Sequence, residues 1–189
     1  MTREEILEAA AQIFSQKGFH AASMQDIAEA VHLQKASLYH HVTSKQEILL
    51  ALLDRALDLL IERMECVIGA SLPPEEKLRQ AMLVYLETLL EHRDLAAVLL
   101  LEFRSLEPEL AARHMPQRDR FEGLWKELIR EGMKNGDFRF PDPGLATRSV
   151  LGAMNWTIIW YRNDGPLAPD SIAGHFTDLF LNGLLSRKG

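Results

Sequence analysis

The spacing of apolar residues predicts that the N-terminal part of the chain is helical. Between residues 3 and 16, apolar side chains recur with a helical period, and Gly18 follows as a C-terminal stop. Ser23 and Asp26 then form the Ser-x-x-Asp pattern that caps the start of a helix. The apolar stripe after this cap is short, so the second helix is expected to have about two turns.

A third and a fourth helix are predicted directly after the second. A break near Val31 and His32 precedes a short helical segment over about residues 34–41. Ser44-Lys45-Gln46-Glu47 is a second capping box, which opens a long helix to about residue 68. Three short helices with a tight break before the third are typical of a helix-turn-helix, whose recognition helix enters the major groove of DNA.

The rest of the chain is also expected to be helical. The predicted helices cover about residues 74–93, 95–103, 108–135, 143–161 and 171–185, and Pro116 is expected to interrupt the third of these. There is no strand-like alternation, repeat or low-complexity tract. The predicted class is therefore all-α with about nine helices: an N-terminal domain of residues 1–47 and a larger C-terminal domain of residues 48–189.

Composition limits the kinds of protein that the chain can be. With 189 residues, 47% of them hydrophobic, it can bury one or two cores. The first residues do not resemble a signal peptide, and no apolar run approaches the roughly 18 residues of a membrane span, so a cytoplasmic protein is expected. Cys66 is the only cysteine, which excludes an internal disulfide, and it is expected to be a small core residue.

The distribution of charge points to a local docking surface for a polyanion. The formal net charge is -6, yet residues 31–46 contain no carboxylate. Residues 1–47 hold four basic and six acidic side chains, so this domain is not broadly basic. A carboxylate pressed against DNA phosphates would be repelled and stripped of water without a partner. The acid-free interval is therefore expected to face DNA.

The same N-terminal region resembles the signature of TetR-family transcriptional regulators. The resemblance rests on Ser23-Met24-Gln25-Asp26-Ile27-Ala28, Lys35, Leu38-Tyr39-His40-His41, and Ser44-Lys45 with Glu47 and Leu49. It covers roughly residues 4–50. His32 stands where the family commonly has Gly, so it is expected to adopt a left-handed backbone. Gln34, Ala36 and Ala22 also replace frequent Ser, Gly and Thr residues, which leaves the operator sequence open.

The candidate DNA contacts follow from this resemblance and from side-chain chemistry. They are Ser23, Gln34, Lys35, Ser37, Tyr39, His40 and Lys45. Lys35, Tyr39, His40 and Lys45 suit phosphate contacts, while Gln34, Ser37 and also Lys35 could reach base edges. For each there is a structural alternative: Tyr39 as a core aromatic, His40 and Lys45 as solvated side chains.

The resemblance implies a homodimer formed by the last two helices. Trp156, Ile159, Trp160, Phe176, Leu179 and Phe180 would supply its apolar surface, and the alternative is that they fill the monomer core. The operator is then expected to be a pseudo-palindrome with half-sites about one helical turn or a little more apart.

The C-terminal domain is net acidic and is expected to bind a small hydrophobic effector that weakens operator binding. Candidate lining residues are Met64, Met82, Tyr85, Leu86, Phe103, Trp125, Asn155 and Trp156, although such side chains are often plain core. The segment GAMNWTIIWYRNDGP is similar to regulators of fatty-acid, phenylacetate and steroid breakdown, which respond to acyl-CoA thioesters. Six arginines could meet the CoA phosphates: Arg104, Arg113, Arg118, Arg120, Arg148 and Arg162.

Other function classes have little support in the sequence. No catalytic motif is present, and no cofactor is expected. The histidines of the N-terminal region lack metal-site spacing within one helix, so no metal site is predicted. The main alternative is a helical small-molecule carrier that does not bind DNA. Repression is the family default, and the regulated genes stay open.

Overall fold

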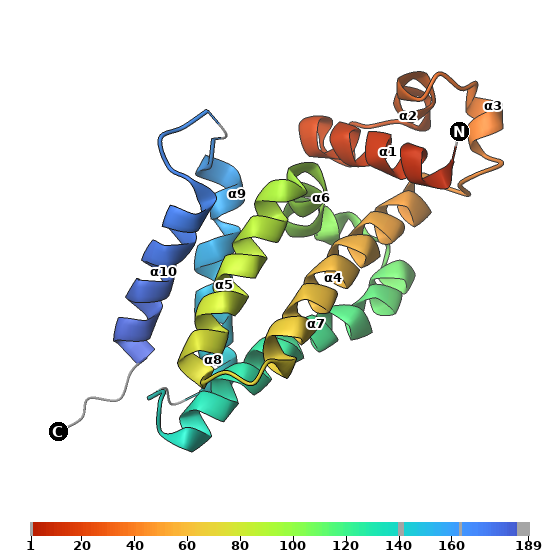
Figure 1. Ribbon diagram of the computed structural model, residues 1–189. Helices are drawn as coiled ribbons and strands as arrows, with labels where there is room; N and C mark the ends of the chain where they lie inside the picture. The colour runs from red at the N-terminus through yellow and green to blue at the C-terminus, as the bar shows by residue number, and fades with distance from the viewer. Residues whose placement is uncertain (1, 140–141, 163, 185–189) are drawn as a thin grey trace. The chain divides into compact units, whose positions relative to one another are not determined.

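A computed structural model describes residues 2–139, 142–162 and 164–184, and confirms the all-α class (Figure 1). The described elements are α1 Arg3–Lys17, α2 Met24–Ala30, α3 Lys35–Leu38, α4 Lys45–Gly69, α5 Pro74–Glu91, α6 Arg93–Ala97, a π-helical turn Val98–Glu102, a 3-10 turn Phe103–Ser105, α7 Pro108–Asn135, α8 Pro143–Asn155, α9 Thr157–Trp160 and α10 Pro169–Leu184.

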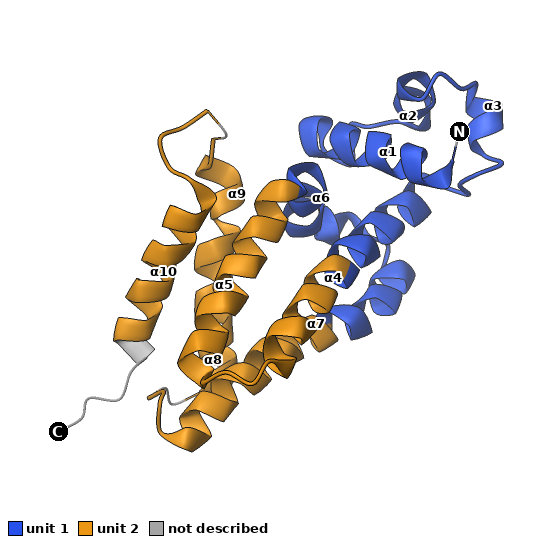
Figure 2. Cartoon of the chain, viewed as in Figure 1, with its two compact units in different colours: residues 1–58, 92–118 blue, residues 59–91, 119–189 orange. Residues whose placement is uncertain are grey.

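The chain forms two compact units, each built from two stretches of sequence. Unit 1 consists of residues 1–58 and 92–118, and unit 2 of residues 59–91 and 119–189 (Figure 2). Helices α4 and α7 therefore each contribute to both units. The predicted domain boundary after residue 47 falls within the part of α4 that belongs to unit 1, and the division at that residue stays a prediction.

Unit 1 has its own apolar core, formed by α1, α2, α3 and the first part of α4. Phe14, Ile27, Leu38 and Leu49 are at most 1% exposed and come from these four helices in turn. Helix α1 also packs on α6. The side chain of Gln46, in the first turn of α4, donates to the carbonyl of Ser105 (2.9 Å) and accepts from the amide of Glu107 (3.1 Å). The first three helices are thus tied to the 92–118 stretch.

In unit 2, α5 packs along α10 (Figure 1). An ion pair between Arg79 and Asp178 (3.2 Å) links the two helices. The core of this unit contains fully buried side chains from α5, α7 and α8. Met82, Trp125 and Met154 show no exposed surface. Apolar burial of this extent is the main stabilising term of a helical domain.

Four local expectations need correction. The α-helical part of the predicted 34–41 segment is only Lys35–Leu38, and hydrogen-bonded turns continue it to Val42. The segment expected as a helix over 95–103 passes from α6 through a π turn into a 3-10 turn. Both are locally distorted helices, which an apolar period cannot distinguish from a regular one.

Pro116 does not interrupt α7, which continues through it. Pro116 and Ala112, whose carbonyl loses its helical partner, are both exposed, so water can satisfy that carbonyl. The fourth correction concerns Cys66, which is exposed and does not belong to the core. It lies between Met64 and Val67, which occupy the buried face of α4.

Candidate DNA-binding surface and effector site

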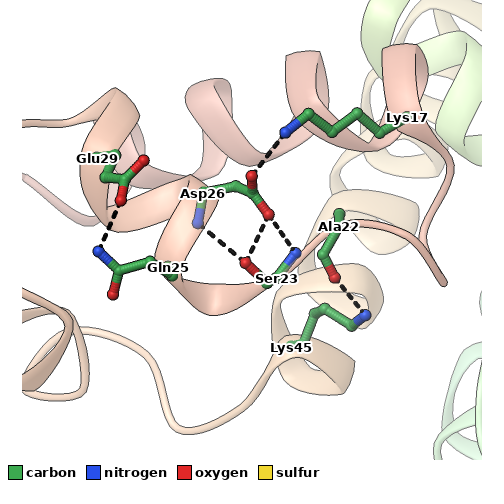
Figure 3. Close-up of polar contacts among 7 residues, drawn as sticks. All are labelled: Lys17, Ala22, Ser23, Gln25, Asp26, Glu29 and Lys45. Atoms are coloured by element: carbon green, nitrogen blue, oxygen red, sulfur yellow. Dashed lines mark hydrogen bonds and ion pairs between the residues drawn. The ribbon is translucent and has the colours of Figure 1, made fainter.

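The capping of α2 fixes the first half of the helix-turn-helix, as the sequence predicts. The hydroxyl of Ser23 accepts from the amide of Asp26 (3.1 Å), and the Asp26 carboxylate accepts from the amide of Ser23 (2.8 Å). Figure 3 shows that Lys17 also reaches this carboxylate, at 2.6 Å. The bond from Lys17, and then those from Ser23, hold the pKa of Asp26 well below its usual range.

The turn between α2 and α3 depends on a left-handed residue. His32 has φ of 55°, which confirms the backbone expected where this side chain replaces Gly. Beside it the amide of Leu33 donates to the carbonyl of Ala28 (2.8 Å). The chain then extends at Gln34 and begins α3 at Lys35, with Leu38 fully buried beneath it. Burial of Leu38 turns the other face of α3 outward.

Most candidate DNA contacts lie on this outward face. Gln34, Lys35, Tyr39 and His40 are exposed, and Ser37 is half-buried. Tyr39 is 47% exposed, so it is not the core aromatic of the alternative interpretation. Among the described residues, no hydrogen bond or ion pair engages these five side chains. They are available to an external partner.

Lys45 and Ser23 have structural contacts of their own. The ammonium of Lys45 donates to the carbonyl of Ala22 (2.6 Å), as Figure 3 shows. It also donates to the carbonyl of Phe19 (2.8 Å) and lies 4.4 Å from the centre of the Phe19 ring. Two of its three donors are therefore used to hold the loop before α2. One donor is left for a phosphate. Ser23 acts as the helix cap, so its hydroxyl is shared with Asp26.

The acids that border the acid-free interval each have a partner. Glu29 accepts from Gln25 (2.8 Å) on α2. Glu47, after the interval, pairs with Arg113 (3.1 Å). Since the charge of Glu47 is partly neutralised by Arg113, the surface around α3 is less repulsive to phosphate than the sequence count of acids implies.

Several effector candidates form a buried cluster in unit 2. Tyr85 donates to the side-chain oxygen of Asn155 (2.5 Å), and its ring stacks on Phe121 and meets Trp125 edge-on, both at 5.8 Å between centres. Met64, Met82 and Leu86 are also buried. Burial raises the pKa of the Tyr85 phenol above its ordinary value, so this group is a neutral hydrogen-bond donor.

Among the described residues of unit 2, the fully buried side chains of Trp125 and Thr157 each have a polar atom without a hydrogen-bond partner. Trp125 has no exposed surface, and its indole N–H meets no acceptor; the hydroxyl of the fully buried Thr157 is likewise unpaired. A buried donor without an acceptor costs about 1–3 kcal/mol. The sequence did not single out Thr157, because a threonine in an apolar helix is indistinguishable from a core residue.

Trp156 and Phe103 lie outside this cluster. Trp156 is 63% exposed on the surface of unit 2. Phe103 belongs to unit 1, where its ring lies 6.5 Å from that of His114 and 4.2 Å from the guanidinium carbon of Arg118.

His114 is a residue that sequence reasoning missed. It is 1% exposed, and its Nδ1 lies 2.7 Å from a carboxylate oxygen of Asp54 on α4. A carboxylate accepts hydrogen bonds, so Nδ1 carries the proton and Nε2 is left without a partner. Nothing in the local sequence signals this burial, because the partner lies 60 residues away.

Unit 2 also contains an open pocket of about 460 Å³ near the start of α10. It is lined by Glu87, Leu90, Glu91, Tyr161, Pro169 and Asp170. None of the effector candidates lines it, and three of its six residues are acidic, so it is unsuited to an anionic ligand.

Neither a metal nor a membrane span is supported by the residues that can be described. Within residues 2–139, 142–162 and 164–184, no group of three potential ligands could hold a metal ion. Over the same ranges, no helix combines the length and the apolar character needed to cross a bilayer.

Comparison with known proteins gives the family. Residues 6–52 match the N-terminal model of the bacterial regulatory proteins of the tetR family, and residues 71–184 match a tetracyclin repressor-like C-terminal domain. The transcriptional repressor KstR2 of Mycolicibacterium smegmatis is 27% identical over 99% of this chain and 92% of its own.

Two solved structures of regulators are similar over almost the whole chain. PfmR from Thermus thermophilus is 38% identical, with a TM-score of 0.86 over 94% of this chain and 97% of its own. AibR, solved with isovaleryl coenzyme A and operator DNA, is 29% identical, with a TM-score of 0.85 over 94% of this chain and 96% of its own. These relatives are regulators and not enzymes, and with both domain matches in the expected order the chain belongs to the tetR family of bacterial transcriptional regulators.

Proposed function

We propose that this chain is a repressor that binds a pseudo-palindromic operator as a homodimer and is released by an acyl-CoA thioester. The observation that carries the DNA-binding part is the surface of α3. Its outward side chains are unengaged, no acid interrupts residues 31–46, and the bordering Glu29 and Glu47 have partners. Gln34 and Ser37 would read base edges, with Lys35, Tyr39, His40 and Lys45 on phosphates.

The homodimer would form through α8, α9 and α10. These helices carry large apolar side chains in solvent: Trp156 is 63% exposed, Ile159 49%, Trp160 39% and Leu179 60%. Monomeric proteins rarely expose such a set together. Gly152 and Gly174 have open space around them, which suits close approach of a second copy.

The effector would place its acyl part among the buried side chains of unit 2. The similarity to AibR, which was solved with isovaleryl coenzyme A and operator DNA, supports a thioester. A thioester carbonyl is an acceptor, which is what the indole N–H of Trp125 lacks. Coupling to DNA follows by linkage, because an effector that favours a form with weak operator affinity removes the dimer from DNA.

The test is retardation of DNA that lies upstream of the chain's own gene. Wild type should retard this DNA at moderate salt, and one of a series of acetyl-, isovaleryl-, decanoyl- and palmitoyl-CoA should abolish the shift. Ser37→Glu, which places an acid on α3, should bind at least about tenfold more weakly. Gln16→Glu is the matched control, since Gln16 is exposed on α1 and lies outside the proposed surface.

A helical carrier would give a different result in the same assay. It would bind thioesters without retarding the DNA, and Ser37→Glu and Gln16→Glu would then be equivalent. Transcription from the upstream promoter in vitro separates repression from activation: added protein should lower the yield of transcript, and the thioester should restore it.

A further inference from the structure

We propose that the open pocket of unit 2 near the start of α10 binds a small organic cation, consisting of an ammonium group on an apolar body. The lining residues are Glu87, Leu90, Glu91, Tyr161, Pro169 and Asp170. All six belong to unit 2, and none of them is among the side chains proposed above for DNA or for the thioester. The inference therefore concerns a second ligand and does not depend on the proposed function.

The pocket forms where α5 ends and α10 begins, at the same end of unit 2 (Figure 1). Glu87, Leu90 and Glu91 have the spacing of one face of α5, close to its end. Pro169 and Asp170 are the first two residues of α10, and Tyr161 follows α9 directly. These three elements surround a volume of about 460 Å³, within the range of about 300–1,000 Å³ typical of small-molecule sites.

Part of the pocket wall is apolar. Tyr161, which is only 7% exposed, forms this part together with Leu90 and Pro169. An apolar wall favours a ligand with a hydrocarbon or aromatic body that leaves water on binding. A metal ion would not use this wall, and no group of three potential metal ligands exists among the described residues. The shape and the wall therefore suit an organic ligand.

The rest of the wall carries two carboxylates without a cation. Glu91 pairs with Arg63 at 2.7 Å. In contrast, no hydrogen bond or ion pair of the described residues engages the carboxylate of Glu87 or Asp170. Arg162 adjoins Tyr161 in the chain, but its guanidinium pairs with Asp164 at 3.0 Å. The pocket thus offers two negative charges that the basic residues in contact with its lining do not balance.

The position of each carboxylate affects how it would meet a cation. Glu87 is half-buried, so its attraction to an ammonium group is screened by water less than that of an exposed acid. Asp170 lies in the first turn of α10, where the helix dipole favours a negative charge without cancelling it. Ionised carboxylates only accept hydrogen bonds, which matches the N–H donors of an ammonium group.

Three ligands of one shape and different charge test the assignment on the full-length protein. They are 2-phenylethylammonium, 2-phenylethanol and 3-phenylpropanoate, titrated at low salt and followed by ligand-detected NMR. We expect the cation to bind at least about tenfold more tightly than the alcohol, and the anion not to bind. Methylammonium, which lacks the apolar body, should bind at least about tenfold more weakly than 2-phenylethylammonium.

Substitutions that remove one charge without changing the shape of the side chain locate the ammonium group. Glu87→Gln and Asp170→Asn should each weaken binding of 2-phenylethylammonium about tenfold and leave the affinity for 2-phenylethanol unchanged. Glu75→Gln is the matched control and should bind like wild type. Glu75 is an exposed glutamate on the same helix, about 18 Å from Glu87 along the axis. The alcohol and thermal melts reveal any variant that is altered by unfolding.

Several outcomes would overturn the site. They are no binding of 2-phenylethylammonium by wild type, equal affinity for the ammonium and the alcohol, and equal losses in Glu87→Gln and Glu75→Gln. A cation that dissociates a dimer in light scattering would also overturn it, since the pocket would then serve association of two copies. Neither operator DNA nor a thioester enters these measurements, so failure of this inference and failure of the proposed function are distinguishable.

Discussion

His32 adopts a strained backbone conformation in the turn between α2 and α3. Its φ of 55° is a conformation that glycine adopts freely and other residues adopt at a cost of about 1 kcal/mol. His32→Gly should therefore stabilise the protein by about 0.5–1 kcal/mol in urea denaturation. His41→Gly is the control, since His41 is exposed at ordinary φ and gains only backbone freedom in the unfolded chain. A lower stability for His32→Gly would contradict this reading of the turn.

The unpaired indole N–H of Trp125 is the proposed donor to the thioester carbonyl of the effector. Trp125→Phe removes the buried N–H together with its desolvation cost, which offsets part of the loss from the smaller ring. The variant should stay within about 2 kcal/mol of wild type in stability but need about tenfold more thioester to release operator DNA. Effector titrations followed by fluorescence anisotropy of labelled DNA measure this. A variant with unaltered thioester response would leave the indole N–H without a ligand role.

Asp26 gives the cap of α2 a defined dependence on pH. Because its pKa is lowered in the folded protein, the carboxylate stabilises the fold above the unfolded value of about 4, and this contribution is lost as the pH falls toward the folded value. Asp26→Asn should thus be less stable than wild type at pH 7, with a difference that shrinks below about pH 4. Urea melts at pH 7, 4 and 3 measure the difference. A gap that is constant over this range would exclude the charge as its cause.

At the scale of elements, α3 is expected to show the salt dependence of a phosphate-contacting helix. Lys35→Ala should weaken operator binding about uniformly across sequence variants and reduce the slope of log K against log salt by about one. Lys134→Ala supplies the control, because Lys134 is an exposed lysine at the end of α7 in unit 2. Anisotropy titrations from 50 to 200 mM salt suffice. Identical slopes for the two variants would remove Lys35 from the phosphate set.

The elements also show what a single sequence can and cannot predict. Capping at Ser23, the stop at Gly18 and the left-handed His32 were predictable because each depends on side chains within a few residues. The π turn at 98–102 and the burial of His114 were not, because both depend on packing against distant helices.

The candidate DNA-binding surface could be predicted from the sequence, whereas the pairing of the candidate arginines could not. Exposure of α3 follows from the position of Leu38, which the apolar pattern marks as inward. In contrast, the separation of free from paired arginines requires knowledge of acids 55 to 66 residues away, such as Glu65 for Arg120 and Glu47 for Arg113. Local motifs predict caps and turns, whereas long-range ion pairs decide which cations remain available.

At the scale of the whole molecule, the exposed apolar side chains of α8 to α10 predict association. Trp156→Ser combined with Leu179→Ser should convert a dimer into a monomer in light scattering after gel filtration, and should weaken operator binding by at least about tenfold. Met115→Ser is the control, since Met115 is an exposed apolar residue of unit 1. A double variant that remains dimeric would place the interface elsewhere.

The π turn at Val98–Glu102 determines the direction in which the side chains of the following segment point around the helix axis. A π turn accommodates one residue more than an α turn, and each residue of an α-helix advances about 100° around the axis. Deleting a single residue there would let the segment rewind as ordinary helix, and Phe103 would then turn about a quarter of a turn away from the guanidinium of Arg118. The number of residues within these five positions therefore matters as much as their side chains, and a relative with a one-residue deletion there would have to hold the counterpart of Arg118 by other contacts.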